Sequence, residues 1–189
     1  MIRIVKLFSG EYVDPFDPDI EKIHIGDIAH SLSHQCRFNG HCDVFYSVAQ
    51  HSVMVCNEVK KHGPVMAMYG LLHDASEMLL GDIVSPVKRE IPLFSLIENT
   101  VSSRIFRRFG LPSPILPKTV DDADKFMLAL EARSLLNCSN DEITNWGLLP
   151  PPSEISLPRP LPPADALGLF LRTFEELSEQ IERVSHEAV

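Results

Sequence analysis

Four residues of this sequence have side chains that bind divalent metal ions, and each lies next to apolar residues. They are His51, the adjacent pair His73 and Asp74, and Asp124. Imidazole nitrogens and carboxylate oxygens form mixed metal sites, and two carboxylates neutralise the charge of a divalent ion. His73 and Asp74 directly follow two leucines, and burying such polar groups is unfavourable unless they are paired or metal-bound. The sequence therefore predicts one metal site shared by three apolar segments.

The three segments are expected to be helices, because apolar residues recur at helical spacing and proline or glycine marks several of their ends. Neighbouring residues on a helix point about 100° apart, so His73 and Asp74 can share an ion only if it lies between them. The expected helices cover residues 26–37, 44–62, 64–80, a stretch from after Pro92 to Phe109, 119–136 and 164–184. Gly81 is expected to end the third helix, and Thr119 to lie at the N-terminal cap of the fifth.

The remaining segments predict small additions to a single domain over residues 1–189. Residues 1–20 are expected to form a β-hairpin, with a turn at Ser9-Gly10, followed by a loop. Residues 140–163 are rich in proline and are expected to wrap over the surface as an extended loop. The helix over 164–184 has an apolar face that is expected to pack on the core. The predicted fold class is all-α with a small N-terminal β-hairpin.

Charge and composition exclude several classes of function. The 189 residues include 17 basic and 26 acidic side chains, which gives a net charge of −9. Nucleic acids and anionic membranes need clustered Lys and Arg, so neither is expected as a partner, whereas a small phosphorylated substrate needs only a metal and a few local cations. No apolar run reaches the length of a membrane span, and the N-terminus lacks the apolar core of a signal peptide. The four cysteines form no CxxC pair, which predicts reduced thiols and a cytoplasmic location.

The order His51, His73-Asp74, Asp124 resembles the H…HD…D signature of the HD-domain superfamily of metal-dependent phosphohydrolases. Within residues 2–136, two branches of that superfamily have similar local runs. Bacterial HD-domain 5′-deoxynucleotidases are similar in the runs His73–Glu77, Gly81-Asp82 and Pro86–Lys88. A subgroup of short phage and bacterial HD proteins, which includes dATP triphosphohydrolases, is similar in the runs Cys36–His41 and Phe45–Ser52.

The resemblance implies an HD-domain helical bundle and a role for each matching residue. The four metal-binding candidates would hold one divalent ion (Mn, Co, Zn or Fe), with room for a second ion on the substrate phosphates. Glu77 would be a catalytic acid or base, and Asp82 a second catalytic carboxylate. The expected substrate contacts are Arg37 and Lys88 on the phosphates, together with Phe38, Asn39 and Phe45.

The implied reaction is hydrolysis of a deoxynucleotide at the phosphorus nearest the sugar, first of all of dATP to the deoxynucleoside and triphosphate. One alternative is a 5′-deoxynucleotidase that releases orthophosphate from deoxynucleoside monophosphates with the same residues. Two others are a nucleotide-binding HD scaffold without catalysis and a stress-alarmone hydrolase. The family also implies a homo-oligomer, located in the host cytoplasm if a phage encodes it.

Several of these residues also have an ordinary structural explanation. Glu77 would then be an exposed helix residue, and Asp82 a turn residue. Arg37 would form a surface ion pair, and Lys88 would belong to a solvated run of charges. The aromatic candidates would be core residues rather than partners of a nucleobase.

Two positions on the expected 119–136 helix bear on the same site. Glu131 lies seven residues after Asp124 and shares its helix face, so it would orient a metal ligand or Arg37, or form a structural ion pair. In the similar subgroup, a lysine often precedes the last metal aspartate by three positions. Asp121 occupies that position here, so this chain either lacks one phosphate-binding cation or supplies it from Lys118 or Lys125.

Overall fold

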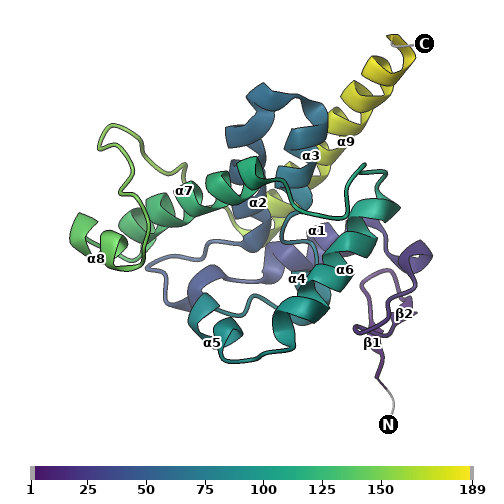
Figure 1. Ribbon diagram of the computed structural model, residues 1–189, viewed down its shortest axis with the longest axis horizontal. Helices are drawn as coiled ribbons and strands as arrows, with labels where there is room; N and C mark the ends of the chain where they lie inside the picture. Colours follow the sequence, from purple (N-terminus) through teal and green to yellow (C-terminus); the bar gives the residue numbers. More distant parts are fainter. Residues whose placement is uncertain (1–2, 188–189) are drawn as a thin grey trace.

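The computed structural model describes residues 3–187 and shows a predominantly helical protein with a two-stranded hairpin near its N-terminus (Figure 1). The predicted fold class is confirmed. Within the described residues, no helix is both long and apolar enough to span a lipid bilayer. The elements, in chain order, are β1 (Val5–Lys6), β2 (Tyr12–Val13), η1 (Ile20–Lys22), α1 (Ile25–His34), η2 (Arg37–Gly40), α2 (Val48–Val59), η3 (Lys60–His62), α3 (Pro64–Leu72), α4 (Glu77–Leu80), α5 (Ser85–Arg89), α6 (Phe94–Arg108), α7 (Lys118–Leu135), α8 (Asn140–Asn145) and α9 (Pro163–Glu187).

Helix α2 lies at the centre of the helical core, where it contacts α1, α3, α7 and α9. A helix that is buried around most of its circumference belongs in the interior of a bundle. Within α2, only Asn57 and Glu58 are exposed, and its buried valines belong to a hydrophobic cluster that extends from Leu7 to Leu177. Since α2 carries His51, this candidate ligand is fixed on the central element of the core.

The predicted hairpin is present, with Val5 opposite Val13 in an antiparallel pair. Gly10 lies in its turn with φ 96°, a conformation that residues with a side chain rarely adopt. The backbone N–H of Ser9 donates to Oδ1 of Asp27 at 2.7 Å, so the turn is tied to α1.

The expected boundaries around the start of α2 were wrong. Helix α1 ends at His34 rather than near Arg37, and the chain beyond it is extended and pairs with the segment that precedes α2. Helix α2 begins at Val48 rather than Val44. The side chain of Ser47 accepts a hydrogen bond from the N–H of the third helical residue, which is a standard helix N-cap.

The helix expected over residues 64–80 is interrupted next to the candidate ligands. Helix α3 ends at Leu72, residues 73–76 form turns, and α4 begins at Glu77. In the interruption the N–H of Ala75 donates to the carbonyl of Leu72 at 3.0 Å, so the hydrogen bond joins residues three apart rather than four. Gly81 follows α4 with φ 77°, as expected for a residue that ends a helix.

The last third of the chain also differs in detail from the expectation. Pro117, rather than Thr119, is the N-cap of α7, and it offers no side-chain hydrogen bond. The stretch 140–163 is not a loop throughout, because it opens with α8 and a capping box. The rest of the stretch is held to the core, where Arg133 donates to the carbonyl of Pro151 and Gln50 to that of Arg159, both at 2.9 Å. Helix α9 starts one residue before the expected 164 and extends past 184.

Helices α2 and α3 approach each other so closely at Gly70 that no side chain fits there. A Cβ at this position would lie 2.8 Å from Cα of Cys56 and 3.0 Å from Cγ2 of Val59. We expect Gly70→Ala to lower the free energy of unfolding by about 1–3 kcal/mol, because the two helices must separate. Urea denaturation measures the change.

Gly26 is the matched control, because it lies in α1 and a Cβ there would meet nothing within 4 Å. Gly26→Ala is expected to be neutral or to stabilise the protein by up to about 1 kcal/mol, through helix propensity. Equal destabilisation by both substitutions would contradict a close approach of α2 and α3 at Gly70.

Candidate metal centre

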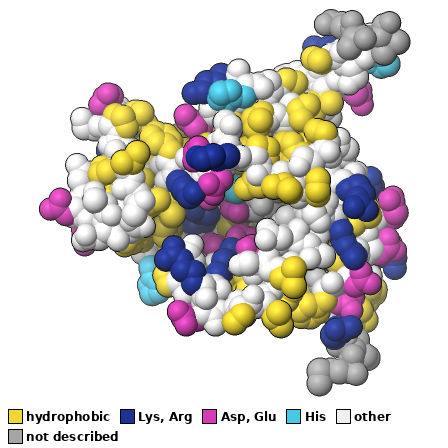
Figure 2. Space-filling view, in the orientation of Figure 1, with side chains coloured by type: hydrophobic (Ala, Val, Ile, Leu, Met, Phe, Trp, Pro, Cys, Tyr) yellow, Lys and Arg dark blue, Asp and Glu magenta, His cyan; other side chains and the backbone are white. Residues whose placement is uncertain are grey.

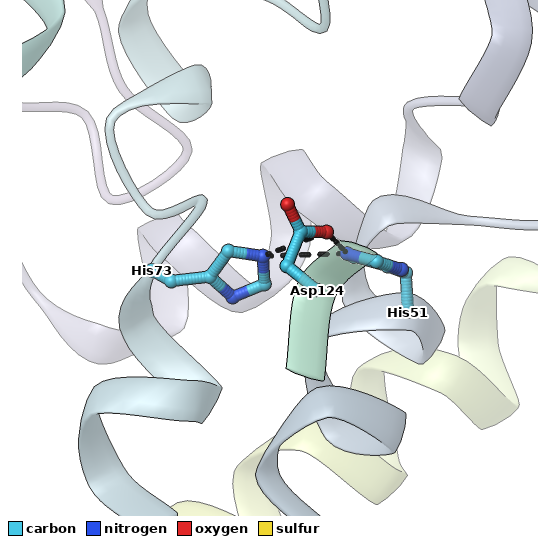
Figure 3. Close-up of side chains that lie close together, drawn as sticks. All are labelled: His51, His73 and Asp124. Carbon is cyan, nitrogen blue, oxygen red and sulfur yellow. Dashed lines mark hydrogen bonds and ion pairs between the residues drawn. The ribbon is translucent and has the colours of Figure 1, made fainter. Parts of the chain in front are cut away.

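Three side chains from three helical regions converge on one point. His51 comes from α2, His73 from the end of α3 and Asp124 from α7 (Figure 3). The two Nε2 atoms are 3.3 Å apart, and Oδ1 of Asp124 lies 3.0 Å from Nε2 of His51 and 3.8 Å from Nε2 of His73. Donor atoms about 2.1 Å from a shared ion are separated by roughly 3.0–3.5 Å. The group therefore could hold a metal ion.

Asp74, the fourth predicted ligand, reaches the same place from the turn after α3. Its Oδ2 lies 3.2 Å from Nε2 of His73 and 3.6 Å from Nε2 of His51. In a continuous helix, two neighbouring side chains would diverge by about 100°. His73 keeps helical dihedral angles at the end of α3, so the adjacent side chains of His73 and Asp74 both reach the metal group because it lies between them.

Hydrogen bonds on the far side of each imidazole direct Nε2 toward the metal group. Nδ1 of His51 lies 2.7 Å from Oε1 of Glu131, and Nδ1 of His73 lies 2.8 Å from the carbonyl of Gly70. Both partners are acceptors, so each Nδ1 carries the proton and each Nε2 offers its lone pair. Metal-binding histidines are commonly oriented in this way.

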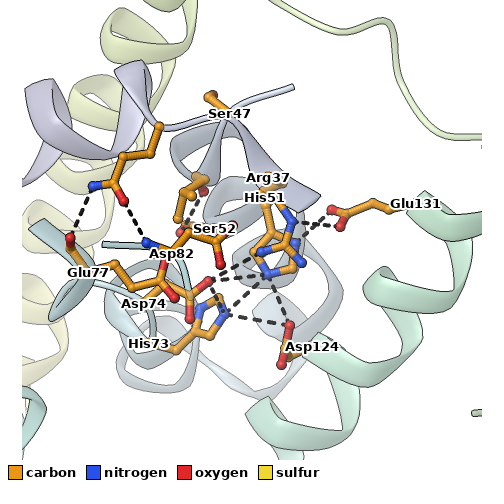
Figure 4. Close-up of polar contacts among 12 residues, drawn as sticks. Arg37, Ser47, His51, Ser52, His73, Asp74, Glu77, Asp82, Asp124 and Glu131 are labelled. Carbon is orange, nitrogen blue, oxygen red and sulfur yellow. Dashed lines mark hydrogen bonds and ion pairs between the residues drawn. The ribbon is translucent and has the colours of Figure 1, made fainter. Parts of the chain in front are cut away.

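Glu131 is fully buried and joins the imidazole to the candidate phosphate-binding arginine (Figure 4). Its Oε2 accepts from Nε of Arg37 at 2.9 Å, while Oε1 faces His51. Burial raises the pKa of Glu131, but Arg37 and His51 outweigh it, so the pKa lies below its usual value and the carboxyl is ionised. The two roles predicted for Glu131, an orienting group and an ion-pair partner, are thus performed by one carboxylate.

The two catalytic candidates lie next to this group. Glu77 is 4% exposed, so it is not a surface residue of its helix. Its Oε1 is 3.4 Å from Nζ of Lys88, and its Oε2 is without a hydrogen-bond partner among the described residues. Burial, then the charges of Asp74 and Asp82, raise the pKa of Glu77 well above its usual value. Burial likewise raises the pKa of Asp82.

The two cations of the site are already paired with carboxylates. Nη1 of Arg37 lies 3.7 Å from Oδ2 of Asp74, in addition to its bond with Glu131. Nζ of Lys88 lies 2.6 Å from Oε1 of Glu98 as well as near Glu77, so Lys88 is not part of a purely solvated run. Figure 2 shows acidic and basic side chains together in a hollow of the surface between α5 and α7.

The remaining substrate candidates lie at the edge of this arrangement. Phe38 and Asn39 have φ of 56° and 51°, and the guanidinium of Arg37 lies 5.4 Å from the centre of the Phe38 ring. Phe45 lines a different surface pocket of about 470 Å³ with Val44 and residues 159–163, and none of the metal group lines it. Their roles in binding a substrate stay predictions.

Two partners of the site carried no signal in the sequence. Glu98 on α6 pairs with Lys88, and the side-chain amide of Gln35 binds the backbone at both ends of the segment 77–82. Both residues are common surface types, and only the packing of α6 and α1 beside α4 and α5 brings them to the site. Asp121 and Lys125, 2.5 Å apart, pair with each other on the exposed side of α7.

The fold and the site together define an all-α protein with a candidate metal centre of two histidines and an aspartate. Over 182 residues the chain is 40% identical to YfdR of Escherichia coli (strain K12). The aligned residues cover 94% of this chain and 97% of YfdR. Over 148 residues it is 34% identical to RCAP_rcc00048 of Rhodobacter capsulatus, with 72% and 75% of the two chains covered. The chain therefore belongs to the family of YfdR. Both relatives are described as uncharacterized proteins, and no family model matches the chain.

The buried contacts of Glu131 generate a prediction about stability and metal binding. Glu131→Ala leaves Arg37 without its closest partner and releases the ring of His51. We expect the free energy of unfolding to fall by roughly 3–5 kcal/mol, because a buried charge loses its partner. Metal affinity is expected to fall about 10–100-fold, because the ligand is no longer oriented. Urea denaturation and isothermal titration calorimetry measure the two effects.

The control is Glu179→Ala, which removes an exposed carboxylate that pairs with Arg183 on α9. Exposed pairs of this kind contribute less than about 0.5 kcal/mol, and metal affinity should not change. If Glu131→Ala bound metal as tightly as the wild type, Glu131 would not orient the ligand.

A second prediction concerns the pH dependence of metal binding. Burial lowers the pKa of His51 and of His73, but the neighbouring carboxylates outweigh it and raise both above the ordinary 6.5. Protons therefore compete with a metal ion for Nε2 through neutral pH. We expect metal affinity to rise between about pH 6.5 and about pH 8.5, with proton release, in calorimetric titrations in buffers of different ionisation enthalpy. An affinity that is the same at both pH values would contradict this assignment of the ligands.

Proposed function

We propose that the protein is a metal-dependent phosphohydrolase of the HD-domain type, which cleaves deoxynucleotides at the phosphorus nearest the sugar. The observation that carries the proposal is the convergence of His51, His73 and Asp124, with Asp74 beside them, in the order of the HD signature. A buried carboxyl and two cations adjoin that group. A ligand set, a proton-transfer group and phosphate-binding cations are the components that such a reaction requires.

Asp74 would complete the ligand set. Its Oδ2 faces both imidazoles, and with Asp124 it supplies two negative charges, which suit a divalent ion. Mixed imidazole and carboxylate ligation fits Mn²⁺, Co²⁺, Fe²⁺ and Zn²⁺ alike. When bound, such an ion polarises a phosphoryl oxygen and makes water a better nucleophile.

Glu77 has the properties of a proton-transfer group. Burial and the charges of Asp74 and Asp82 raise its pKa and favour the protonated carboxyl, which can exchange a proton with water or with a leaving oxygen. Its unpartnered Oε2 is available for that exchange. A protein that only binds nucleotides gains nothing from a buried carboxyl with one unpartnered oxygen, so Glu77 favours catalysis over a binding scaffold.

The ion pairs of Arg37 and Lys88 bear on how many phosphates the substrate carries. Arg37 and Lys88 each face two carboxylates, so little positive charge is free to balance an anionic substrate. Lys118 and Lys125, the two candidates for replacing the absent lysine, form exposed pairs with Asp122 and Asp121 on α7, which supports the view that neither binds a phosphate. A triphosphate needs more compensation than a monophosphate with its charge of about −2. This balance favours a 5′-deoxynucleotidase, while the triphosphate reaction would require a second ion on the phosphates.

The test is a product analysis by HPLC with protein loaded with Mn²⁺, Co²⁺ or Zn²⁺. Deoxynucleoside and orthophosphate from deoxynucleoside monophosphates are the expected products. Deoxynucleoside and intact triphosphate from a deoxynucleoside triphosphate, strongest for dATP, would instead establish the triphosphohydrolase. Equal rates on ribonucleotides would exclude the preference for deoxyribose. Absence of any product with all three metals would leave a metal-binding scaffold or an alarmone substrate as the better explanation.

Glu77→Gln tests the mechanism with little change in shape. We expect kcat to fall about 10²–10⁴-fold, because the amide cannot transfer a proton, with metal affinity close to that of the wild type. Asp74→Asn should also lower kcat, and it should weaken metal binding. Glu58→Gln, an exposed acid on α2, is the control and should leave kcat unchanged. Wild-type turnover by Glu77→Gln would remove Glu77 from the mechanism.

A further inference from the structure

Gln35, at the C-terminus of α1, binds the segment that carries both catalytic candidates. Its Nε2 donates to the carbonyl of Glu77 at 3.1 Å, and its Oε1 accepts from the backbone N–H of Asp82 at 3.0 Å. The same Nε2 also donates to Oγ of Ser31 at 3.0 Å, which holds the amide in place on α1. One side chain thus binds the two ends of the segment 77–82.

The segment 77–82 has little internal stability. Helix α4 is a single turn of four residues, and helices this short do not persist without tertiary contacts. Within it, the N–H of Gly81 bonds to the carbonyl of Glu77 at 2.8 Å, and Gly81 then reverses the chain with φ 77°. From α1, Oγ of Ser31 adds a longer contact of 3.4 Å to the carbonyl of Met78. The closest side-chain hydrogen bonds between α1 and this segment come from Gln35.

The backbone of Gln35 is fixed to the helix that carries His51. The carbonyl of Gln35 accepts from the N–H of Val48, the first residue of α2, at 3.1 Å. Two residues on, the N–H of Arg37 donates to the carbonyl of Tyr46 at 2.9 Å, so residues 35–37 run antiparallel to 46–48. Side chains alternate along an extended segment, which places Gln35 and Arg37 on one side of it.

This short extended segment therefore organises two parts of the site at once. Arg37 reaches Glu131 and Asp74, while Gln35 reaches the backbone at Glu77 and Asp82. Figure 4 shows Glu77 and Asp82 beside Asp74. Each negative charge here disfavours ionisation of the other two carboxyls, so hydrogen bonds to the backbone of the segment 77–82 help to keep the three side chains together.

We propose that Gln35 is a positioning residue, which holds Glu77 and Asp82 beside the metal group through their backbone. Its effect on turnover rests on the proposed function, since it acts through Glu77, whereas its effect on the segment 77–82 does not. Gln35 contacts no candidate metal ligand, so metal binding should be independent of it.

The experiment compares the wild type with Gln35→Met, which is similar in size and forms neither hydrogen bond. We expect kcat to fall about 10–100-fold, because small displacements of a catalytic group have effects of that order, with KM changed less than about threefold. Metal affinity should stay within about twofold, because His51, His73 and Asp124 keep their own contacts. Hydrogen exchange of the amides in residues 77–82, above all that of Asp82, should become faster.

Two further variants separate positioning from general destabilisation. Gln35→Glu keeps an acceptor for the N–H of Asp82 but loses the donor to Glu77, and it should show exchange at Asp82 closer to the wild type than Gln35→Met. Tyr69→Phe is the matched control, because it also removes two hydrogen bonds to backbone, both to Ser113. It should speed exchange near Ser113 and leave kcat unchanged.

Each outcome decides a different point. Unchanged exchange in residues 77–82 of Gln35→Met would overturn the proposal directly. Unchanged kcat despite faster exchange would show that this segment need not be held for turnover. A loss of kcat with an equal loss of metal affinity would mean that Gln35 supports the whole site rather than Glu77 and Asp82. If the wild type hydrolyses no nucleotide, the proposed function fails, and the exchange data alone decide whether Gln35 holds the segment.

Discussion

The buried carboxylate of Glu131 is the constraint on which the rest of the site depends. A charge with no exposure to water is stable only with partners, and Glu131 has a guanidinium on one oxygen and an imidazole on the other. Satisfying it therefore fixes α7, α2 and the segment after α1 relative to one another. The same contacts aim Nε2 of His51 and hold Arg37 beside Asp74, so structural stability and the metal centre share one interaction.

The turn between α3 and α4 joins the candidate ligands to Glu77. Helix α3 ends at Leu72, His73 and Asp74 follow it directly, and α4 begins at Glu77. Helix α4, which begins at Glu77, is a single turn of four residues, and such a short helix needs support from other elements. Ser31 on α1 and Gln35, which directly follows α1, provide it, so the end of α1 is part of the candidate site although it carries no candidate ligand.

Local charge bears on how a protein of net charge −9 could accept the anionic substrate that we propose for it. The acidic side chains near the metal group are matched in part by Arg37 and Lys88, and a divalent ion would add the remaining positive charge locally. Because both cations are shared with carboxylates, the site can balance only a limited negative charge. Membership of the YfdR family brings no activity with it, so these local charges are the main guide to the substrate.

The sequence by itself determined the residue types of the site and the helical class. His51, His73-Asp74 and Asp124 could be selected from sequence because polar side chains within apolar, periodic segments must converge or remain unsatisfied. The hairpin was predictable because its turn needs Gly10. These signals are local, arising from spacing, burial pattern and turn chemistry within a few residues.

Only the tertiary structure decided where the helices stop and which residues meet. The segments that follow α1 and precede α2 pair with each other, and helix α3 ends at Leu72, within the stretch expected to be one helix. Arg37 and Glu131 are 94 positions apart, and Gln35 and Asp82 are 47 apart. The first contact was one of the alternatives that the helix face of Asp124 suggested for Glu131, whereas no local pattern marks the second. Gln35 is an ordinary surface residue type until packing brings the backbone of the segment 77–82 beside it.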